Sequence, residues 1–129
     1  MKNLLIDSHL LIWMLFEPKR ISNQAKKILS ESNDVYVSLA SIWELAIKHN
    51  KGRLVYSPKE LLSGTDALEA KLLSIDSSHI LALANIKSSH GDPFDRILLA
   101  QAKTENLLLV TADAQMVGLG LDYVVEAGS

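Results

Sequence analysis

The sequence has no cysteine among its 129 residues and no run of 18 uninterrupted apolar residues. The first absence excludes disulfides, a thiolate nucleophile and cysteine-containing zinc sites, and it fits a reducing compartment. The second excludes a membrane-spanning helix on length. A secretory leader does not fit the apolar start of the chain, because Asp7 and His9 interrupt it and no small-residue cleavage site follows. We therefore expect a cytoplasmic protein with no membrane segment.

A strong excess of one charge sign is also missing, since 13 basic and 15 acidic residues give a formal net charge of -2. Without a general basic field, composition alone makes nucleic acid an unexpected partner. The charges are unevenly spread, because bases outnumber acids in residues 1–64 and acids outnumber bases in residues 65–129. The chain lacks linkers, repeats and low-complexity tracts, so its length predicts a single domain over residues 1–129.

Short apolar runs alternate with helical patterns along the chain. Runs that are more continuous than alternating are typical of strands covered on both faces, which implies a parallel sheet. The runs occupy residues 4–6, 35–37, 72–75, 107–110 and 123–125. Helices are expected over residues 8–16, 22–32, 39–50, from 57 onward, 77–86, 92–105, and briefly after 113. This order predicts an α/β fold with a five-stranded, mostly parallel sheet flanked by about seven helices.

The first of these helices is apolar on every side between Leu10 and Phe16. One face is expected to join the core, and the other is expected to meet a partner, either a helix of another protein or a second subunit.

Four acidic side chains are expected on one rim of the sheet, where the site of an open parallel sheet lies. Asp7 follows the first strand and Asp113 the fourth, and for each the simpler alternative is a helix cap. Glu44 is expected one turn inside its helix, although Ser41 and Glu44 also match a capping box. Asp95 begins a helix that is apolar nearly all round, and a carboxylate on a buried helix needs a partner.

The joint pattern of these carboxylates predicts a metal site. Two carboxylates about 5 Å apart repel by roughly 3 kcal/mol at an effective dielectric constant of about 20, so four together need a cation. Oxygen ligands without histidine or cysteine select Mg²⁺ or Mn²⁺. Such an ion orients water for attack on a phosphodiester. Asp92, which precedes Pro93, is expected to act mainly as a helix cap.

Basic side chains accompany the acidic ones. Lys48, Lys51 and Arg53 cluster at the end of the helix that carries Glu44, and Arg96 follows Asp95. Basic residues at a helix end often complement the helix dipole. In this position they are equally suited to hold phosphates beside a metal, and the sequence leaves both roles open.

Four segments of the chain resemble the motifs of PIN domains, and they are most similar to those of the VapC toxins of bacterial toxin–antitoxin pairs. The resemblance covers about residues 3–125 and is most specific over residues 90–102. The segments are Leu4-Leu5-Ile6-Asp7-Ser8, Ser41-Ile42-Trp43-Glu44-Leu45, His90-Gly91-Asp92-Pro93-Phe94-Asp95-Arg96 and Leu109-Val110-Thr111-Ala112-Asp113.

This resemblance implies a PIN-domain fold and a metal-dependent endoribonuclease. Asp7, Glu44 and Asp95 would bind Mg²⁺, with Mn²⁺ as a substitute, and Asp113 would complete the acidic pocket more weakly. Thr111 would place its hydroxyl at the pocket rim. Asp92 and Arg96 would support the site. The family further implies a homodimer and a cognate VapB-like antitoxin whose peptide blocks the site.

Two other functions fit parts of the pattern. A non-catalytic module would use the acidic pocket only to hold an arginine of a protein partner. A small phosphoryl-transfer domain fits less well, because a haloacid-dehalogenase-like enzyme needs a second Asp where His9 stands. A receiver domain needs a Lys that the tail Val125-Glu126-Ala127 lacks.

A bound metal would change the net charge that an approaching RNA strand meets. One or two divalent cations would bring the formal -2 to 0 or +2. RNA affinity is then expected to be modest and to depend on the metal and on a few placed bases.

Overall fold

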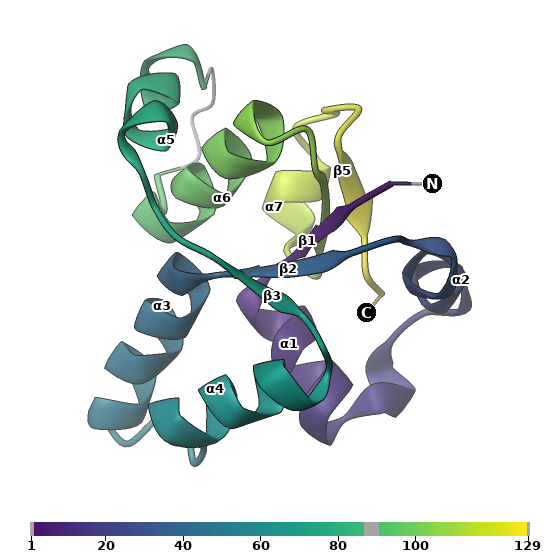
Figure 1. Cartoon of the computed structure of the whole chain (residues 1–129), viewed down its shortest axis with the longest axis vertical. Helices are drawn as coiled ribbons and strands as arrows, with labels where there is room; N and C mark the ends of the chain where they lie inside the picture. The colour runs from purple at the N-terminus through teal and green to yellow at the C-terminus, as the bar shows by residue number, and fades with distance from the viewer. Residues whose placement is uncertain (1, 87–90, 129) are drawn as a thin grey trace.

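The computed structural model describes residues 2–86 and 91–128. Its centre is a five-stranded sheet in the order β3-β2-β1-β4-β5, and every neighbouring pair is parallel (Figure 1). The strands are β1 (Leu4–Ile6), β2 (Val35–Ser38), β3 (Lys71–Leu73), β4 (Leu108–Thr111) and β5 (Val124–Glu126). The predicted α/β class and strand number are confirmed, and the sheet is wholly rather than mostly parallel.

Seven α-helices connect the strands within the described ranges, and each begins after a polar residue whose side chain accepts a backbone N–H. Such caps satisfy donors that the first turn leaves unpaired. None of these helices is long and apolar enough to cross a bilayer. They are α1 (Ser8–Phe16), α2 (Asn23–Glu31), α3 (Leu39–Asn50), α4 (Pro58–Ala67), α5 (Ser77–Ala82), α6 (Pro93–Thr104) and α7 (Ala114–Val117), with 3₁₀ turns η1 (Pro18–Arg20) and η2 (Leu83–Asn85).

The strands bury both faces of the sheet because successive side chains point to opposite sides. Leu4 and Ile6 of β1 pack with Val110 against α1–α4. Leu5 and Leu109 face the other layer, formed by α5, α6 and α7. Two apolar cores therefore sandwich the sheet and hold its carboxyl edge in place.

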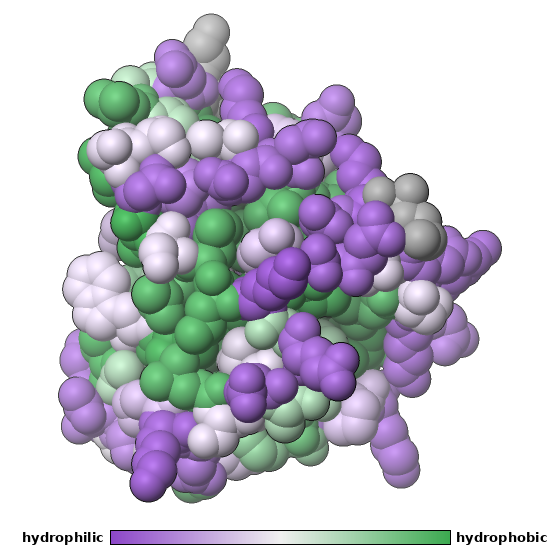
Figure 2. All heavy atoms as spheres, viewed as in Figure 1, coloured by the Kyte–Doolittle hydropathy of each residue, from purple (hydrophilic) through white to green (hydrophobic). Residues whose placement is uncertain are grey.

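The strand at one edge of the sheet departs from the predicted pattern. β3 begins at Lys71, ends at Leu73 and leaves Leu72 exposed, so the expectation that every strand is covered on both faces is wrong here. Ile75, Ile80 and the exposed Leu72 add to an apolar surface. Figure 2 shows apolar side chains gathered on this face between α5 and α4, with hydrophilic ones around them.

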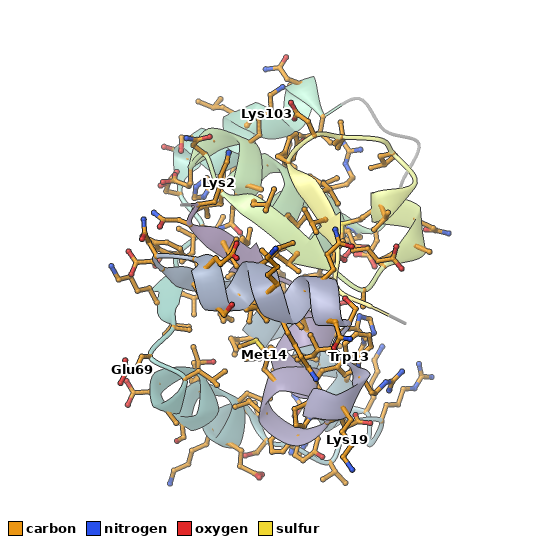
Figure 3. The ribbon with its side chains drawn as sticks, turned by 90° about the vertical axis from the view of Figure 1, so that its right-hand side faces the viewer. Lys2, Trp13, Met14, Lys19, Glu69 and Lys103 are labelled. Atoms are coloured by element: carbon orange, nitrogen blue, oxygen red, sulfur yellow. The ribbon has the colours of Figure 1, made fainter. Side chains whose placement is uncertain are left out.

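The first helix is covered more completely than its sequence suggests. Leu10, Leu11 and Trp13 are buried, and Ile12, Met14 and Leu15 pack half-buried against the same core. In Figure 3, Trp13 and Met14 lie where α1 meets α2, whereas Lys19 lies at the periphery. Only Phe16 of this stretch is exposed, and it stacks on Tyr56 at a centroid distance of 3.6 Å. The expected core face of α1 is therefore confirmed, and contact of its remaining side with a partner stays a prediction.

The end of the chain ties the sheet to α2. The Ala127 N–H donates to the Thr111 carbonyl at 2.7 Å, and the Ala127 carbonyl accepts from the Ser22 N–H at 3.0 Å. Gly128 follows with φ +130°, and a Cβ at this position would lie 2.7 Å from the Ser22 nitrogen and 3.0 Å from the Arg20 carbonyl oxygen. Only glycine fits without moving backbone.

Replacing this glycine should loosen the connection. Gly128→Ala is expected to lower the free energy of unfolding by about 1–3 kcal/mol, because the strained φ and the backbone contact cannot both be relieved. Urea unfolding followed by circular dichroism measures the change. Gly91→Ala is the control, since its Cβ would meet nothing within 4 Å, and it should change stability by less than about 0.5 kcal/mol. Equal stability of the two variants would contradict the expectation.

Candidate functional site

The first predicted acidic residue, Asp7, lies at the point where the strand order reverses. β1 is central, with β2 and β3 on one side and β4 and β5 on the other. Asp7 directly follows β1, and Thr111 ends β4 beside it. Ligands of open parallel sheets bind outside the carboxyl ends of the strands at such a switch point. The topology therefore places Asp7 where a site is expected.

Asp7 is a buried carboxylate held by three donors. Its Oδ1 accepts from the Leu10 N–H at 2.8 Å, which caps α1. Its Oδ2 accepts from the Thr111 hydroxyl at 2.6 Å and from the Ala112 N–H at 3.1 Å. The side chain is only 2% exposed, and within the described residues no Lys, Arg or His nitrogen lies within 4.0 Å of it. Asp7 is thus a helix cap and also a buried charge without a cationic partner there.

Thr111 links Asp7 to Asp113. Its Oγ1 donates to Asp7 and accepts from the Asp113 N–H at 3.0 Å. The residue is fully buried, so its hydroxyl binds the Asp7 carboxylate inside the fold and is not exposed at a pocket rim as expected. Asp113 caps α7 through its Oδ1, which accepts from the Gln115 N–H at 2.7 Å. Thr111 therefore fixes both acidic residues by one hydroxyl group.

Glu44 reaches the same edge from α3. Its Oε1 accepts from the Ser8 hydroxyl at 3.0 Å, and its Oε2 lies 4.0 Å from the Lys48 ammonium. The capping-box alternative is wrong, because the cap of α3 is Ser38 and Ser41 lies inside the helix. Sequence reasoning missed Ser8, although a hydroxyl directly after Asp7 was the available signal. This buried serine joins α1 to the glutamate of α3.

The start of α6 contributes two further carboxylates. Asp92 caps the helix, as expected, because its Oδ1 accepts from the N–H groups of Phe94 at 2.8 Å and Asp95 at 3.3 Å. Asp95 lies in the first turn and is only 9% exposed, which agrees with the prediction of a carboxylate on a buried helix. His90 of the same motif lies outside the described residues.

A basic groove of about 280 Å³ runs beside these acidic residues. Its cationic walls are Lys48, Lys51 and Arg53, and its other lining includes Glu44 and Asp92. The three cations predicted to hold phosphates are therefore brought together on one surface.

Arg96 differs from the other predicted cations. Its Nη2 donates to the carbonyls of Leu83 and Ile86, each at 3.4 Å, at the end of η2. It is not among the side chains that line the basic groove. Among the described residues the guanidinium thus joins α6 to η2, and its phosphate role stays a prediction.

A separate group of potential ligands lies at the far end of α6. Atoms of Asp76, His79 and Glu105 all lie within 4.8 Å of one another. The Nδ1 of His79 accepts the Asp76 N–H at 3.1 Å, so Nε2 carries the proton that it donates to Glu105 at 2.9 Å. The Ser78 hydroxyl is the main cause that lowers the pKa of Asp76. Both nitrogens of the buried histidine are occupied, so this group joins α5 to α6.

The chemistry of the four predicted ligands fits a hard divalent cation, although among the described residues Asp76, His79 and Glu105 form the only group whose ligand atoms all lie within 4.8 Å of one another. Asp7, Glu44, Asp95 and Asp113 offer only carboxylate oxygens, which Mg²⁺ and Mn²⁺ prefer. Oδ2 of Asp7 has two protein donors but Oδ1 has only one, so Oδ1 retains acceptor capacity. Hydrogen bonds that hold ligand carboxylates in place are typical of metal sites.

Comparisons with known proteins point to one fold family. A family model described as PIN domain matches residues 4–119. Ribonuclease VapC22 of Mycobacterium tuberculosis is 29% identical over 119 residues, which are 90% of this chain and 91% of that protein. A toxin–antitoxin complex from Klebsiella pneumoniae superposes with a TM-score of 0.64 at 19% identity, over 95% of both chains. DNA-bound VapBC from Salmonella typhimurium gives a TM-score of 0.67 at 13% identity, over 98% of this chain and 97% of that one.

The Thr111 hydroxyl should be essential for the stability of this edge. Thr111→Val keeps the shape but removes the donor to Asp7 and the acceptor of the Asp113 N–H. The free energy of unfolding is expected to fall by about 1–3 kcal/mol, the cost of leaving buried polar groups unpaired. Chemical denaturation measures it, with Thr104→Val at the exposed end of α6 as the matched control. A loss at Thr111 no larger than at Thr104 would refute this role.

Proposed function

Since the chain belongs to the PIN-domain family, we propose that it is a metal-dependent endoribonuclease and the toxin of a type II toxin–antitoxin pair, which cleaves cellular RNA in the cytoplasm. One observation carries this proposal: the buried Asp7 carboxylate stands at the switch point with no cationic partner within 4.0 Å among the described residues. A charge in that setting needs a counter-ion. The ribonuclease named among the relatives supports the choice of reaction.

Asp7, Glu44 and Asp95 are the proposed ligands of Mg²⁺ or Mn²⁺, and Asp113 completes the acidic set. When bound, the ion would supply positive charge that activates water and offsets the charge developing on the phosphodiester. The chain itself supplies the alignment of these carboxylates. Thr111 holds Asp7 and Asp113, and Ser8 holds Glu44, which supports a common site for these three carboxylates.

The basic groove is the proposed path of the RNA backbone. Lys51 and Arg53 are exposed and line the groove next to Glu44 and Asp92. Lys48 lies 4.0 Å from Glu44, so it balances that carboxylate as well as facing the groove. Phosphate contacts of this kind set affinity and position without reading sequence.

A protein partner is part of the proposal. The structural neighbours are described as toxin–antitoxin and VapBC complexes, which supports a VapB-like antitoxin that blocks the acidic edge. We also propose a homodimer, as the family resemblance implies.

Removal of one buried carboxylate should abolish RNA cleavage. Asp95→Asn is expected to reduce Mg²⁺-dependent cleavage of RNA by at least about 100-fold, above the effect typical of residues that only support metal ligands. Gel analysis of RNA after incubation with Mg²⁺ measures the activity, and calorimetric titration with Mn²⁺ should show weakened binding. Asp66→Asn, at an exposed position of α4, is the matched control.

Two outcomes would count against the enzyme. Cleavage by Asp95→Asn at the wild-type rate would contradict the assigned mechanism. A wild-type protein that neither cleaves RNA nor binds Mn²⁺ would instead support the alternative of a module whose acidic pocket holds an arginine of its partner.

The basic groove makes a second prediction. The double variant Lys51→Gln/Arg53→Gln should weaken RNA binding and reduce its salt dependence, because each lost phosphate contact lowers the slope of log affinity against log salt by about 0.7 for single strands. Fluorescence anisotropy of a labelled RNA in EDTA, at several salt concentrations, measures both. Lys26→Gln/Lys27→Gln on exposed α2 positions removes the same charge elsewhere. An equal effect of both pairs would show that only net charge matters.

A further inference from the structure

Lys48 connects the basic groove with one of the proposed metal ligands. Its ammonium lies 4.0 Å from Oε2 of Glu44. In the described part of the chain, no Lys, Arg or His nitrogen lies within 4.0 Å of Asp7 or Asp113. Lys48 also lines the basic groove. It therefore has two potential anionic partners, the Glu44 carboxylate and a phosphate of the RNA.

The contact between Lys48 and Glu44 is an ion pair without a hydrogen bond. A separation of 4.0 Å exceeds the range of about 2.7–3.2 Å for an N–H···O hydrogen bond. Glu44 is fixed instead by the Ser8 hydroxyl, which donates to Oε1 at 3.0 Å. The Lys48 side chain is 41% exposed, against 15% for Glu44. Charge alone thus holds the flexible ammonium, which can leave without disturbing the carboxylate.

The end of α3 places Lys48 beside the other cations of the groove. Gly52 takes a φ of +71°, and its N–H donates to the His49 carbonyl at 3.0 Å. The Arg53 N–H donates to the Lys48 carbonyl at 2.9 Å. This pattern is a Schellman motif, which reverses the chain after the helix and returns Arg53 next to Lys48. Lys51 lies three residues after Lys48, so the three cations are available to one phosphate strand.

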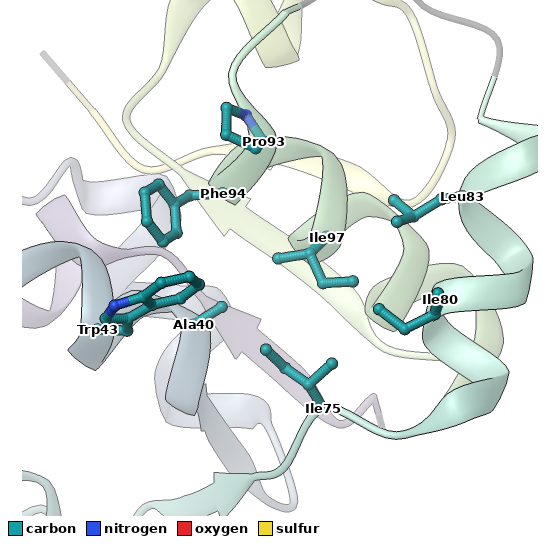
Figure 4. Close-up of a pocket in the computed structure, with 8 residues that line it drawn as sticks. All are labelled: Ala40, Trp43, Ile75, Ile80, Leu83, Pro93, Phe94 and Ile97. Carbon is teal, nitrogen blue, oxygen red and sulfur yellow. The ribbon is translucent and has the colours of Figure 1, made fainter.

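The rest of the groove gives Lys48 no second carboxylate within 4.0 Å, as far as the described residues extend. Phe94 also lines the groove, and Figure 4 shows this ring beside Trp43, edge-to-face at a centroid distance of 5.1 Å. The other acidic lining residue, Asp92, caps α6 through Oδ1. Lys48 is therefore paired with Glu44 as long as no other anion enters.

Glu44 carries a single negative charge, which either Lys48 or a bound ion neutralises. An ion held by Glu44 repels the ammonium, because both are positive. A phosphate in the groove then offers Lys48 a new negative partner. Because each event removes a competitor of the other, occupation of Glu44 by the ion and phosphate binding by Lys48 favour each other by the same factor.

We propose that Lys48 is an exchangeable counter-ion, which neutralises Glu44 until the metal binds and then binds a phosphate of the RNA. It is a positioning residue that couples the two binding events and is not itself a metal ligand. This proposal rests on the proposed ribonuclease function. The simpler alternative is a fixed ion pair between residues four apart on α3, which predicts no such coupling.

A double-mutant cycle without metal tests the exchange directly. Glu44→Gln keeps the acceptor of the Ser8 hydroxyl but removes the charge that holds Lys48. Fluorescence anisotropy of a labelled single-stranded RNA in EDTA, at several salt concentrations, measures affinity and its salt dependence. In the Glu44→Gln background, Lys48→Gln should lower the slope of log affinity against log salt by about 0.7, or about 5-fold in affinity at about 0.1 M salt, the value for one phosphate contact. In the wild-type background it should lower the slope by less than half of this amount.

Metal binding provides a second readout that does not depend on RNA. Lys48→Gln removes the competitor, so Mn²⁺ should bind about 2- to 5-fold more tightly in calorimetric titration, the range for loss of one partly exposed ion pair. Lys48→Arg keeps the charge and should bind Mn²⁺ no more tightly than the wild type.

Lys51→Gln is the matched control. It removes the same charge from the groove at a residue that has no carboxylate within 4.0 Å among the described residues. Its affinity for Mn²⁺ should equal that of the wild type. Circular dichroism checks that each variant is folded.

The outcomes are distinct. A larger slope change in the Glu44→Gln background, together with tighter Mn²⁺ binding by Lys48→Gln, supports the proposal. Equal slope changes in both backgrounds, or Mn²⁺ binding by Lys48→Gln no tighter than by the wild type, overturn it. If Glu44→Gln does not fold, the Mn²⁺ titration decides alone. Failure of the ribonuclease proposal would appear separately, as absence of Mg²⁺-dependent cleavage by the wild-type protein.

Discussion

The burial of one negative charge governs the arrangement of this molecule. Asp7 ends the central strand, and its carboxylate is removed from water by the elements that it also joins. The Leu10 N–H of α1 and the Thr111 hydroxyl and Ala112 N–H at the end of β4 all point toward it. A buried carboxylate is tolerated only when such donors are in place. The same hydrogen bonds that lower the cost of burying the charge, while leaving it without a counter-ion, also set the spacing of β1, α1 and β4.

The strands and the helix starts could be predicted from the sequence, because both depend on residues that are close together in the chain. Apolar runs marked the strands, and polar residues such as Asp92 and Asp113 marked the helix starts, because caps and buried parallel strands leave a short-range signature. Contacts between segments that are far apart in the sequence could not be predicted in this way. The Ser8–Glu44 hydrogen bond joins residues 36 positions apart, and the burial of Thr111 depends on layers on both sides of the sheet. The exposure of Trp43 likewise depends on where α5 and α6 lie, which the local sequence does not show.

The net charge of the chain and the positions of its charged side chains in the fold lead to different expectations about a polyanionic partner. The formal net charge of -2 speaks against a polyanion partner, but it averages over groups that the fold separates. Lys51 and Arg53 are exposed and line one groove, whereas Asp7 and Asp95 are buried. At a Debye length of about 8 Å in physiological salt, an approaching strand responds to the charges nearest to it rather than to the total. A weakly acidic protein is thus able to present a locally basic surface.

The distance along the chain between the two sides of the acidic edge has a consequence for biosynthesis. The hydrogen bond from Thr111 to Asp7 spans 104 positions in a chain of 129 residues. Synthesis proceeds at about 5–20 residues per second, and the N-terminal part folds first. While β4 is still inside the ribosome, the central strand β1 lacks one of its two neighbouring strands. Asp7 then also lacks two of its three hydrogen-bond donors, Thr111 and Ala112. The edge is therefore completed only as translation ends, and nascent or prematurely terminated chains do not carry it.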